Sequence, residues 1–264
     1  MKQLTEVQLQ DNWNKLIQVI KDTFEDGSER REKLLKMYHD LEDRMIMAPA
    51  SGKEEYHYCH VGGYVEHVLH VVDTARKMSD TYEASGGHKN WTDEELVFSA
   101  LHHDLGKVGD MDKDYYVPQD SEWHRKNRGE IFTHNGELSY MTVTDRAIFL
   151  LNQFGIKMSE NEYIGLRLTD GLYEEANKTY YMNWSKDNQL KSNIAYILHQ
   201  ADMMATKIEY NEWQRDDYSY NTEFGDGKTK EEMEKIDKQN MERMSKKKEE
   251  SKRSHELFKE LFDE

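Results

Sequence analysis

The sequence is poor in cysteine, proline and long apolar runs: it contains one cysteine, Cys59, and two prolines, Pro49 and Pro118. A single thiol has no partner for a disulfide within the chain, which favours a reducing compartment such as the cytoplasm. Because prolines are so few, long helices can run without interruption. No stretch approaches the ~18 apolar residues typical of a membrane-spanning helix, and the first residues show no apolar signal core. We therefore expect a cytoplasmic, helix-rich protein without a membrane segment.

Basic residues are fewer than acidic ones: the chain has 36 Lys and Arg residues and 52 Asp and Glu residues, and its net charge is −16. Binding to duplex nucleic acid depends on clustered basic residues, so a broad interface of that kind is not expected. A local basic pocket for one nucleotide remains compatible with this balance, and a bound divalent cation would offset acidic charge locally. A length of 264 residues with 36% hydrophobic residues is enough for one large domain with an appendage.

The spacing of apolar residues predicts an all-α fold. Thr92 and Glu95 have the spacing of a capping box, which predicts that a helix begins there. Residues 110–140 lack a helical period, although residues 115–117 and 130–133 have the composition of two short strands that pair as a β-hairpin. Further amphipathic helices are expected over residues 12–24, 29–47, 62–80, 144–154, 159–169 and 190–210.

The end of the chain has a different composition from the rest. Residues 216–229 are rich in Asp and Gly and are typical of a linker, whereas residues 230–264 are dense in Lys and Glu. We expect a domain over residues 1–215, then this linker, then a charged helical arm. The arm is interpreted as a solvated helix, and a docking or oligomerisation helix is the alternative.

His103 and Asp104 are adjacent at the end of an apolar helical run, and Gly106 and Lys107 follow at once. Neighbouring residues on a helix point about 100° apart, so both can bind one ion only if other helices complete the set of ligands. A buried Asp also needs a partner that offsets its desolvation, and a divalent ion is one such partner. The remote candidates on apolar helices are His67 and Asp202.

The order of these motifs resembles the HD-domain metal-dependent phosphohydrolase superfamily over roughly residues 35–215. The segment from His57 to His67 is similar to its first motif, residues 103–107 to its second, and Ala201-Asp202 to its last. The resemblance implies an HD-domain helical bundle that is closest to small cytoplasmic or phage-encoded members, in the host cytoplasm for the latter. The implied metal ligands are His67, His103, Asp104 and Asp202.

Some members of this superfamily bind a second metal through two further histidines, and here the sequence departs from the pattern. The corresponding positions fall at Val143 and near Thr169, so we expect a mononuclear site, with His134 as the alternative second-metal ligand. This departure weakens the case for the oxygenase members, which need two irons. Two His and two Asp ligands suit one divalent transition metal, namely Mn, Fe, Co, Ni or Zn, and suit calcium poorly.

Several other residues are candidates for catalysis or for lining the pocket. Lys107 follows the metal motif closely enough to reach a phosphate, and its alternative is a surface lysine near a helix end. Asp170 or Glu174 is the candidate general base, and the sequence does not choose between them. His57 and His60 either line the pocket or pack in a loop.

Candidate substrate contacts form one basic and aromatic cluster and two isolated arginines. Residues 123–128 combine Trp123 for base stacking with cations for phosphates, and a solvated loop is the alternative. The two arginines lie on apolar helices, where each needs a buried anionic partner or faces the pocket. The predicted substrate-binding residues are Trp123, Arg125, Lys126, Arg128, Arg146 and Arg167.

The function expected from these features is metal-dependent hydrolysis of a nucleotide phosphate ester or anhydride through a metal-activated water. One alternative is a 3′–5′ exonuclease or cyclic-nucleotide phosphodiesterase, because the first motif also resembles HD exoribonucleases. Another is a non-catalytic, metal-stabilised protein that binds a nucleotide. The expected partner is a nucleotide-like small molecule, and the sequence leaves homo-oligomerisation open.

Overall fold

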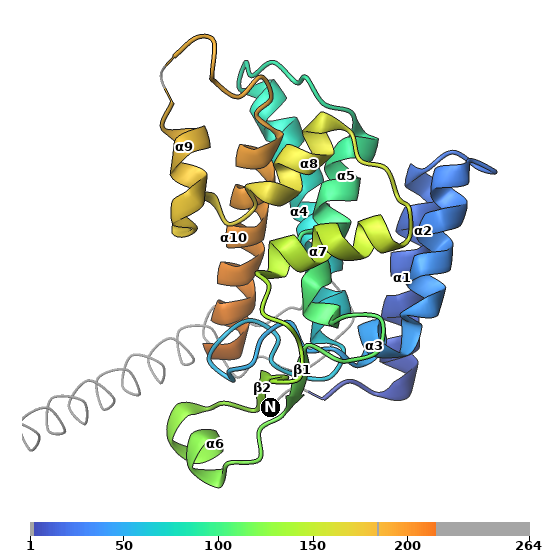
Figure 1. Cartoon of the computed structure of the whole chain (residues 1–264), viewed down its shortest axis with the longest axis vertical. Helices are drawn as coiled ribbons and strands as arrows, with labels where there is room; N and C mark the ends of the chain where they lie inside the picture. The colour runs from blue at the N-terminus through green and yellow to red at the C-terminus, as the bar shows by residue number, and fades with distance from the viewer. Residues whose placement is uncertain (1–2, 184, 215–264) are drawn as a thin grey trace, which may run out of the picture. The chain divides into compact units, whose positions relative to one another are not determined.

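The computed structural model describes residues 3–183 and 185–214 of the chain. Residues 1–210 form one compact unit, and a second unit begins at Asn211. Within the described residues there are ten α-helices, three short 3-10 helices and one two-stranded antiparallel sheet (Figure 1). The expectation of a mostly helical protein with a small hairpin is therefore confirmed. The predicted linker over 216–229 and the predicted arm over 230–264 lie outside the described residues.

The first helices are α1 (Glu6–Thr23), α2 (Glu29–Asp40) and α3 (Glu42–Met47). Helix α1 begins six residues earlier than predicted, because Thr5 and Gln8 form a capping box ahead of the apolar stripe. The prediction of a single helix over residues 29–47 is wrong. The chain forms two helices there, because Leu41 has φ of −109° and ψ of 8° and separates α2 from α3.

The centre of the unit is formed by α4 (Gly63–Ala84) and α5 (Asp93–His102), which pack against each other. The capping box predicted at Thr92 and Glu95 is present, so the predicted start of α5 is confirmed. All residues of α5 from Leu96 to His102 are buried, and apolar side chains of α4 complete this part of the core. The two helices thus provide a rigid, dry support for the side chains at their ends.

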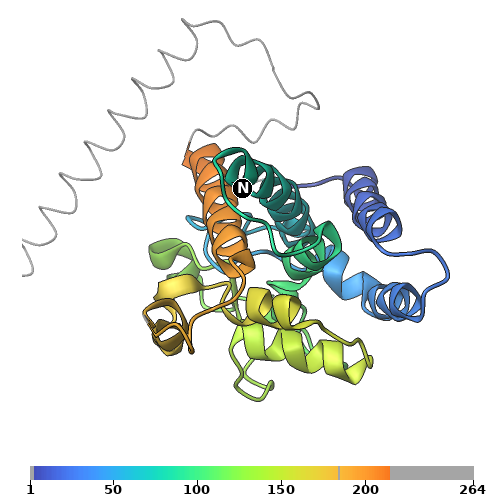
Figure 2. The same ribbon diagram turned by 90° about the horizontal axis from the view of Figure 1, so that it is seen from above.

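The remaining helices surround this pair, and α10 runs alongside α4 in both views (Figures 1 and 2). A 3-10 helix, η1 (Leu105–Val108), continues the chain after α5 and lies against α7. A Cβ atom at Gly106 would lie only 2.0 Å from Val143 O, so the contact between η1 and α7 requires glycine at this position. The other bounds are α7 (Val143–Gln153), α8 (Glu160–Arg167), η2 (Gly171–Tyr173), η3 (Glu175–Asn177), α9 (Lys178–Tyr181) and α10 (Ile194–Gln214).

The predicted hairpin is present as β1 (Tyr116–Pro118) and β2 (Phe132–His134), which pair antiparallel with Tyr116 opposite His134. The expectation that this region contains no helix is wrong. The segment of chain that connects β1 to β2 contains the helix α6 (Glu122–Arg128) (Figure 1). Helix α6 buries none of its residues, which explains why no apolar period marks it. Backbone hydrogen bonds from Ile131 and Phe132 to Gly52 O attach this hairpin insertion, residues 116–134, to the loop that precedes α4.

None of the helices in the described part of the chain combines the length and the apolar character that crossing a bilayer requires.

Candidate metal centre

Four side chains from three remote segments converge in the interior of the unit. His67 Nε2 lies 3.2 Å from His103 Nε2, 3.3 Å from Asp202 Oδ1 and 3.5 Å from Asp104 Oδ2. His103 Nε2 lies 3.6 Å from Asp104 Oδ2 and 3.8 Å from Asp202 Oδ1. An ion bound at about 2.0–2.2 Å holds neighbouring ligand atoms about 3.0–3.5 Å apart, so this spacing fits a single coordination site. The four sequence-predicted metal ligands are thus brought together.

The backbone explains how two consecutive residues reach the same point. His103 still has helical dihedral angles and forms the C-cap of α5, whereas Asp104 has φ of −107° and ψ of 9° and has left the α-helix. The turn from α5 into η1 therefore changes the 100° separation that a continuous helix would impose, and both side chains reach His67. His103 Nδ1 lies 2.8 Å from Ala100 O, and a proton donated from Nδ1 leaves Nε2 as the free acceptor.

Burial differs around the centre and defines its open side. The side chains of His67 and His103 are each 1% exposed, and that of Asp104 is 13% exposed. The side chain of Asp202 is 25% exposed, more than any of the other three. A small molecule would therefore reach the centre past Asp202 on α10.

The attraction between imidazole rings and carboxylates dominates the electrostatics of the centre. Burial opposes protonation of His67, but the carboxylates of Glu209 and Asp202 outweigh it and raise the pKa of His67 to about 10. Burial would also raise the pKa of Asp202, but hydrogen bonding to His67 and the nearby His103 hold that pKa well below its ordinary value. The positive charges of Lys107, His103 and His67 likewise outweigh burial and lower the pKa of Asp104, so the carboxylates of Asp104 and Asp202 are both kept ionised, as ligands for a cation must be.

Lys107, on η1, lies beside the centre and is largely buried. Its ammonium group donates to Asp104 Oδ2 at 2.6 Å and to Ala50 O at 2.8 Å. Burial would lower the pKa of Lys107, but the carboxylate of Asp104 outweighs this effect and raises it, so the group stays charged. The predicted position of Lys107 next to the metal motif therefore places a permanent positive charge at the site.

His57 also lies at the centre. One nitrogen of His57 lies within 4.8 Å of the ligand atoms of both His67 and Asp104, and its ring contacts that of His67 at a tilt of 40° with centroids 4.5 Å apart. Burial lowers the pKa of His57 to about 3, so its imidazole is neutral. Its Nε2 is buried and has no hydrogen-bond partner among the described residues. A buried polar atom without a partner is costly, and a bound ion or substrate group would satisfy it.

Sequence reasoning missed Glu209, which is fully buried and lies 3.0 Å from the far side of His67, at Nδ1. It also missed His70, whose Nδ1 lies 2.8 Å from Glu209 Oε1. The sequence does contain a spacing that relates Glu209 to the centre. Glu209 follows Asp202 by seven residues, which is two helical turns and therefore the same face of α10.

The alternative second-metal ligand, His134, does not join the centre. It is exposed at the end of β2, where its ring stacks against Tyr115 and Tyr116. Among the described residues, the groups of three or more side chains whose ligand atoms lie within 4.8 Å of one another both contain His67. The two groups therefore overlap at His67.

Of the two candidate bases, Asp170 is the one that interacts with the centre. Burial, and then the charges of Asp104 and Asp202, raise its pKa, and it accepts a hydrogen bond from Thr144 Oγ1 at 3.3 Å. Glu174 instead uses its carboxylate to accept the backbone N–H of Ala176 at the start of η3.

The predicted substrate contacts divide into two groups. Arg146 and Arg167 donate to oxygens that carry no full charge, Ser139 O and Asn177 Oδ1, rather than to carboxylates. The basic cluster forms the exposed helix α6, where Arg128 lies over the ring of Trp123 at 5.9 Å from its centroid. The other members of the cluster bond within the insertion, Arg125 to Gln119 O and Lys126 to Glu122.

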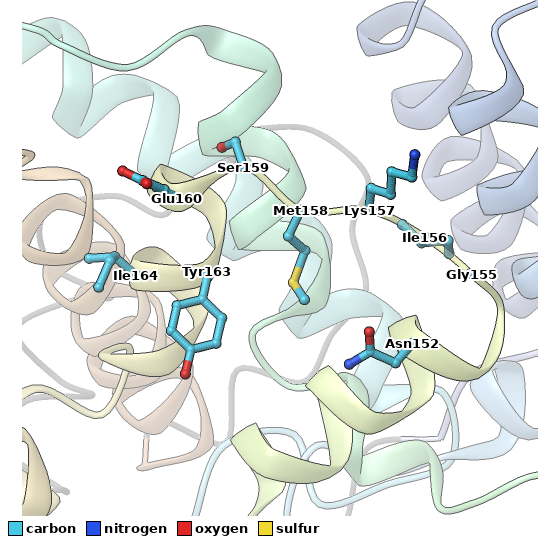
Figure 3. Close-up of a pocket in the computed structure, with 9 residues that line it drawn as sticks. All are labelled: Asn152, Gly155, Ile156, Lys157, Met158, Ser159, Glu160, Tyr163 and Ile164. Carbon is cyan, nitrogen blue, oxygen red and sulfur yellow. The ribbon is translucent and has the colours of Figure 1, made fainter.

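A separate open groove of about 810 Å³ lies along the loop between α7 and α8 (Figure 3). It is lined by Met158 and Tyr163 among others, and none of the predicted site residues borders it. The groove is therefore distinct from the cluster of His and Asp side chains.

Comparison of the chain with protein-family models, with curated proteins and with solved structures finds no match in any of the three.

Proposed function

We propose that this protein is a metal-dependent phosphohydrolase of the HD-domain type that acts on a nucleotide phosphate ester or anhydride. The observation that carries the proposal is that His67 Nε2 and His103 Nε2 lie 3.2 Å apart, and that one carboxylate oxygen of Asp104 and one of Asp202 each lie 3.3–3.8 Å from both nitrogens. The order of these residues along the chain and their positions on α4, at the junction of α5 with η1 and on α10 support the HD-domain assignment.

The donor set determines which ions fit. Two imidazole nitrogens and two carboxylate oxygens are of intermediate hardness and suit Mn²⁺, Fe²⁺, Co²⁺, Ni²⁺ or Zn²⁺. Such an ion, when bound, lowers the pKa of a bound water and offsets the charge of a phosphoryl group. Burial of His67 and His103 keeps bulk water away from one side, while the exposure of Asp202 leaves the other side open to a substrate.

Charged residues around the centre fit a phosphate substrate. The ammonium group of Lys107 supplies a fixed positive charge beside Asp104, and it binds an oxygen of an anionic substrate in this proposal. Asp170 is the proposed general base, because burial and the nearby carboxylates of Asp104 and Asp202 raise its pKa, so it takes up a proton more readily than an ordinary aspartate. Glu174 is not proposed in this role, because its carboxylate is occupied as a helix cap.

The experiment is a substrate screen with metal present. Purified protein is incubated with Mn²⁺, Co²⁺ or Ni²⁺ and with nucleoside mono-, di- and triphosphates, cyclic nucleotides and short single strands, and multiple-turnover product release is measured. The Asp104→Ala variant is the control. It should lose both bound metal and activity while its helical circular dichroism is retained. Full metal occupancy in Asp104→Ala by elemental analysis would contradict the proposed centre.

The screen also separates the alternative functions. Turnover of cyclic nucleotides or single strands in preference to nucleoside phosphates would reassign the substrate class. Stoichiometric nucleotide binding without turnover under any metal would indicate a binding protein instead of an enzyme.

A further inference from the structure

The side of His67 that faces away from the centre is bound to a buried carboxylate. His67 Nδ1 lies 3.1 Å from Glu209 Oε1 and 3.0 Å from Oε2, so both oxygens face the same ring nitrogen. His67 lies on α4 and Glu209 on α10, and the two residues are 142 positions apart in the chain. The contact therefore connects the two helices directly behind the candidate metal centre.

Burying this carboxylate is costly, because the buried side chains of α10 nearest to it on this face are apolar and Asp202, which shares the face, is itself negatively charged. Ala201 and Ala205, which lie on the same face, are both fully buried, and Glu209 itself is 0% exposed. An apolar side chain at position 209 would pack there without the cost of removing a charge from water. A carboxylate in such a place is explained by what it does to the imidazole that it contacts.

An imidazole ring has two nitrogens, and a carboxylate bound to one of them decides which nitrogen carries the proton. With Glu209 accepting from Nδ1, a neutral His67 keeps its proton on Nδ1 and its lone pair on Nε2, where a bound metal ion would take the place of the second proton of the charged ring. Nε2 is the same atom that lies 3.2 Å from His103 Nε2 and 3.3 Å from Asp202 Oδ1. The proton is thus held on the nitrogen that points away from the centre.

We propose that Glu209 is a positioning residue that holds His67 in the Nδ1–H tautomer with Nε2 directed at the metal, and that His70 anchors Glu209. This inference rests on the metal centre of the proposed function. His70 is one turn after His67 on α4, and its Nδ1 lies 2.8 Å from Glu209 Oε1. His70 belongs to neither of the candidate ligand groups among the described residues, so its part is to fix the rotamer of the carboxylate.

The first test is the metal affinity of Glu209→Gln. Glutamine keeps the volume of the side chain but replaces one acceptor oxygen with an N–H₂ donor, which opposes a proton on Nδ1. The Kd for Zn²⁺, measured by competition with a chelating dye, should rise by about 10- to 100-fold. His70→Phe should raise the Kd by less, because His67 keeps its acceptor. Glu83→Gln, at an exposed position of α4, controls for the loss of one negative charge and should leave the Kd unchanged.

The second test uses the wild-type protein, so it does not depend on whether a variant folds. Nitrogen-15 NMR of the histidine rings in the Zn²⁺-loaded protein reports which nitrogen carries the proton. The inference requires the proton of His67 on Nδ1. Coordination through Nδ1, or a Kd for folded Glu209→Gln equal to that of the wild type, would overturn the role of Glu209 but leave the metal centre standing. Failure of the wild-type protein to bind any transition metal would overturn the metal centre and this inference with it.

Discussion

Lys107 Nζ lies 2.6 Å from Asp104 Oδ2, three residues away along η1, and both side chains are 13% exposed. In the absence of metal this ammonium group neutralises a carboxylate that is also a candidate ligand. Removing one partner of a buried ion pair leaves the other charge uncompensated, which typically costs about 3–5 kcal/mol. A metal ion at the centre would compensate Asp104 in place of the lysine. The pair therefore connects metal occupancy to folding stability.

We predict that Lys107→Met lowers the free energy of unfolding of the metal-free protein by about 3–5 kcal/mol. Added Mn²⁺ should recover most of this loss, so the stabilisation by metal should be larger in the variant than in the wild type. Urea unfolding with EDTA and with Mn²⁺ measures both quantities. Lys178→Met is the matched control, because Lys178 and Glu175 form an exposed pair with the same spacing at 2.9 Å, worth about 0–1 kcal/mol. Equal losses of unfolding free energy in the two variants would show that the buried Lys107–Asp104 pair stabilises the protein no more than an exposed pair does.

A second prediction concerns the glycine between the metal motif and Lys107. A Cβ at Gly106 would lie 2.0 Å from Val143 O and 2.9 Å from Val143 Cα, which are backbone atoms that cannot rotate away. Gly106→Ala should therefore push η1 from α7 and cost about 1–3 kcal/mol of stability. Its metal affinity should also fall, because Asp104 begins the same turn. Gly136→Ala is the control, since a Cβ there meets no atom within 4 Å.

The sequence identified the four side chains that converge because each lies in a short local motif, whereas the groups behind them depend on packing. His103 and Asp104 are adjacent, and the apolar period around His67 and Asp202 identified their helices. The spacing of seven residues from Asp202 places Glu209 on the same face of α10, but only the packing of α10 beside α4 shows that this glutamate is buried against His67.

Elements with a local chemical cause were also easier to predict than elements without one. Thr92 and Glu95 satisfy backbone groups at the start of α5, so the helix start followed from four residues of sequence. Helix α6 buries none of its residues and so leaves no apolar period, and its local signs are the N-cap Ser121 and the left-handed C-cap Gly129. The break at Leu41 has no proline or glycine to signal it, so one helix was predicted where two exist.

The thiol of Cys59 leads to a prediction about pH. Burial raises its pKa to about 12, from an ordinary value near 9 in the unfolded chain. A raised pKa means that the native state holds the proton more tightly. This contribution to stability is complete below about pH 9 and is lost as the pH rises toward 12.

At pH 8 we therefore expect the native protein to react with a thiol reagent far more slowly than a free cysteine does, and to react fully in urea. Absorbance of the released chromophore of a disulfide reagent follows the reaction over time. Labelling of the native protein at the rate of an unstructured peptide thiol would contradict the burial of Cys59.

The last prediction concerns the basic cluster on α6. Arg125 and Arg128 lie on a helix without buried residues, so replacing them should not disturb the core. The insertion that carries them is hydrogen-bonded to Gly52, in the loop that also carries His57. The cluster is therefore attached to a segment that reaches the centre, and loops on a rigid scaffold are where binding residues tend to lie.

If α6 binds the phosphates of a substrate, Arg125→Ala/Arg128→Ala should weaken a polyphosphate substrate much more than a monophosphate. Each lost charge-assisted contact should cost roughly 1.5–3 kcal/mol, or about 10- to 150-fold in kcat/KM. Metal content should not change. Lys186→Ala/Lys191→Ala removes the same charge from exposed positions outside the insertion and should leave kcat/KM within about 2-fold, because distant surface charges are screened by salt. An unchanged kcat/KM in the arginine variant for every accepted substrate would mean that the cluster is only a solvated helix.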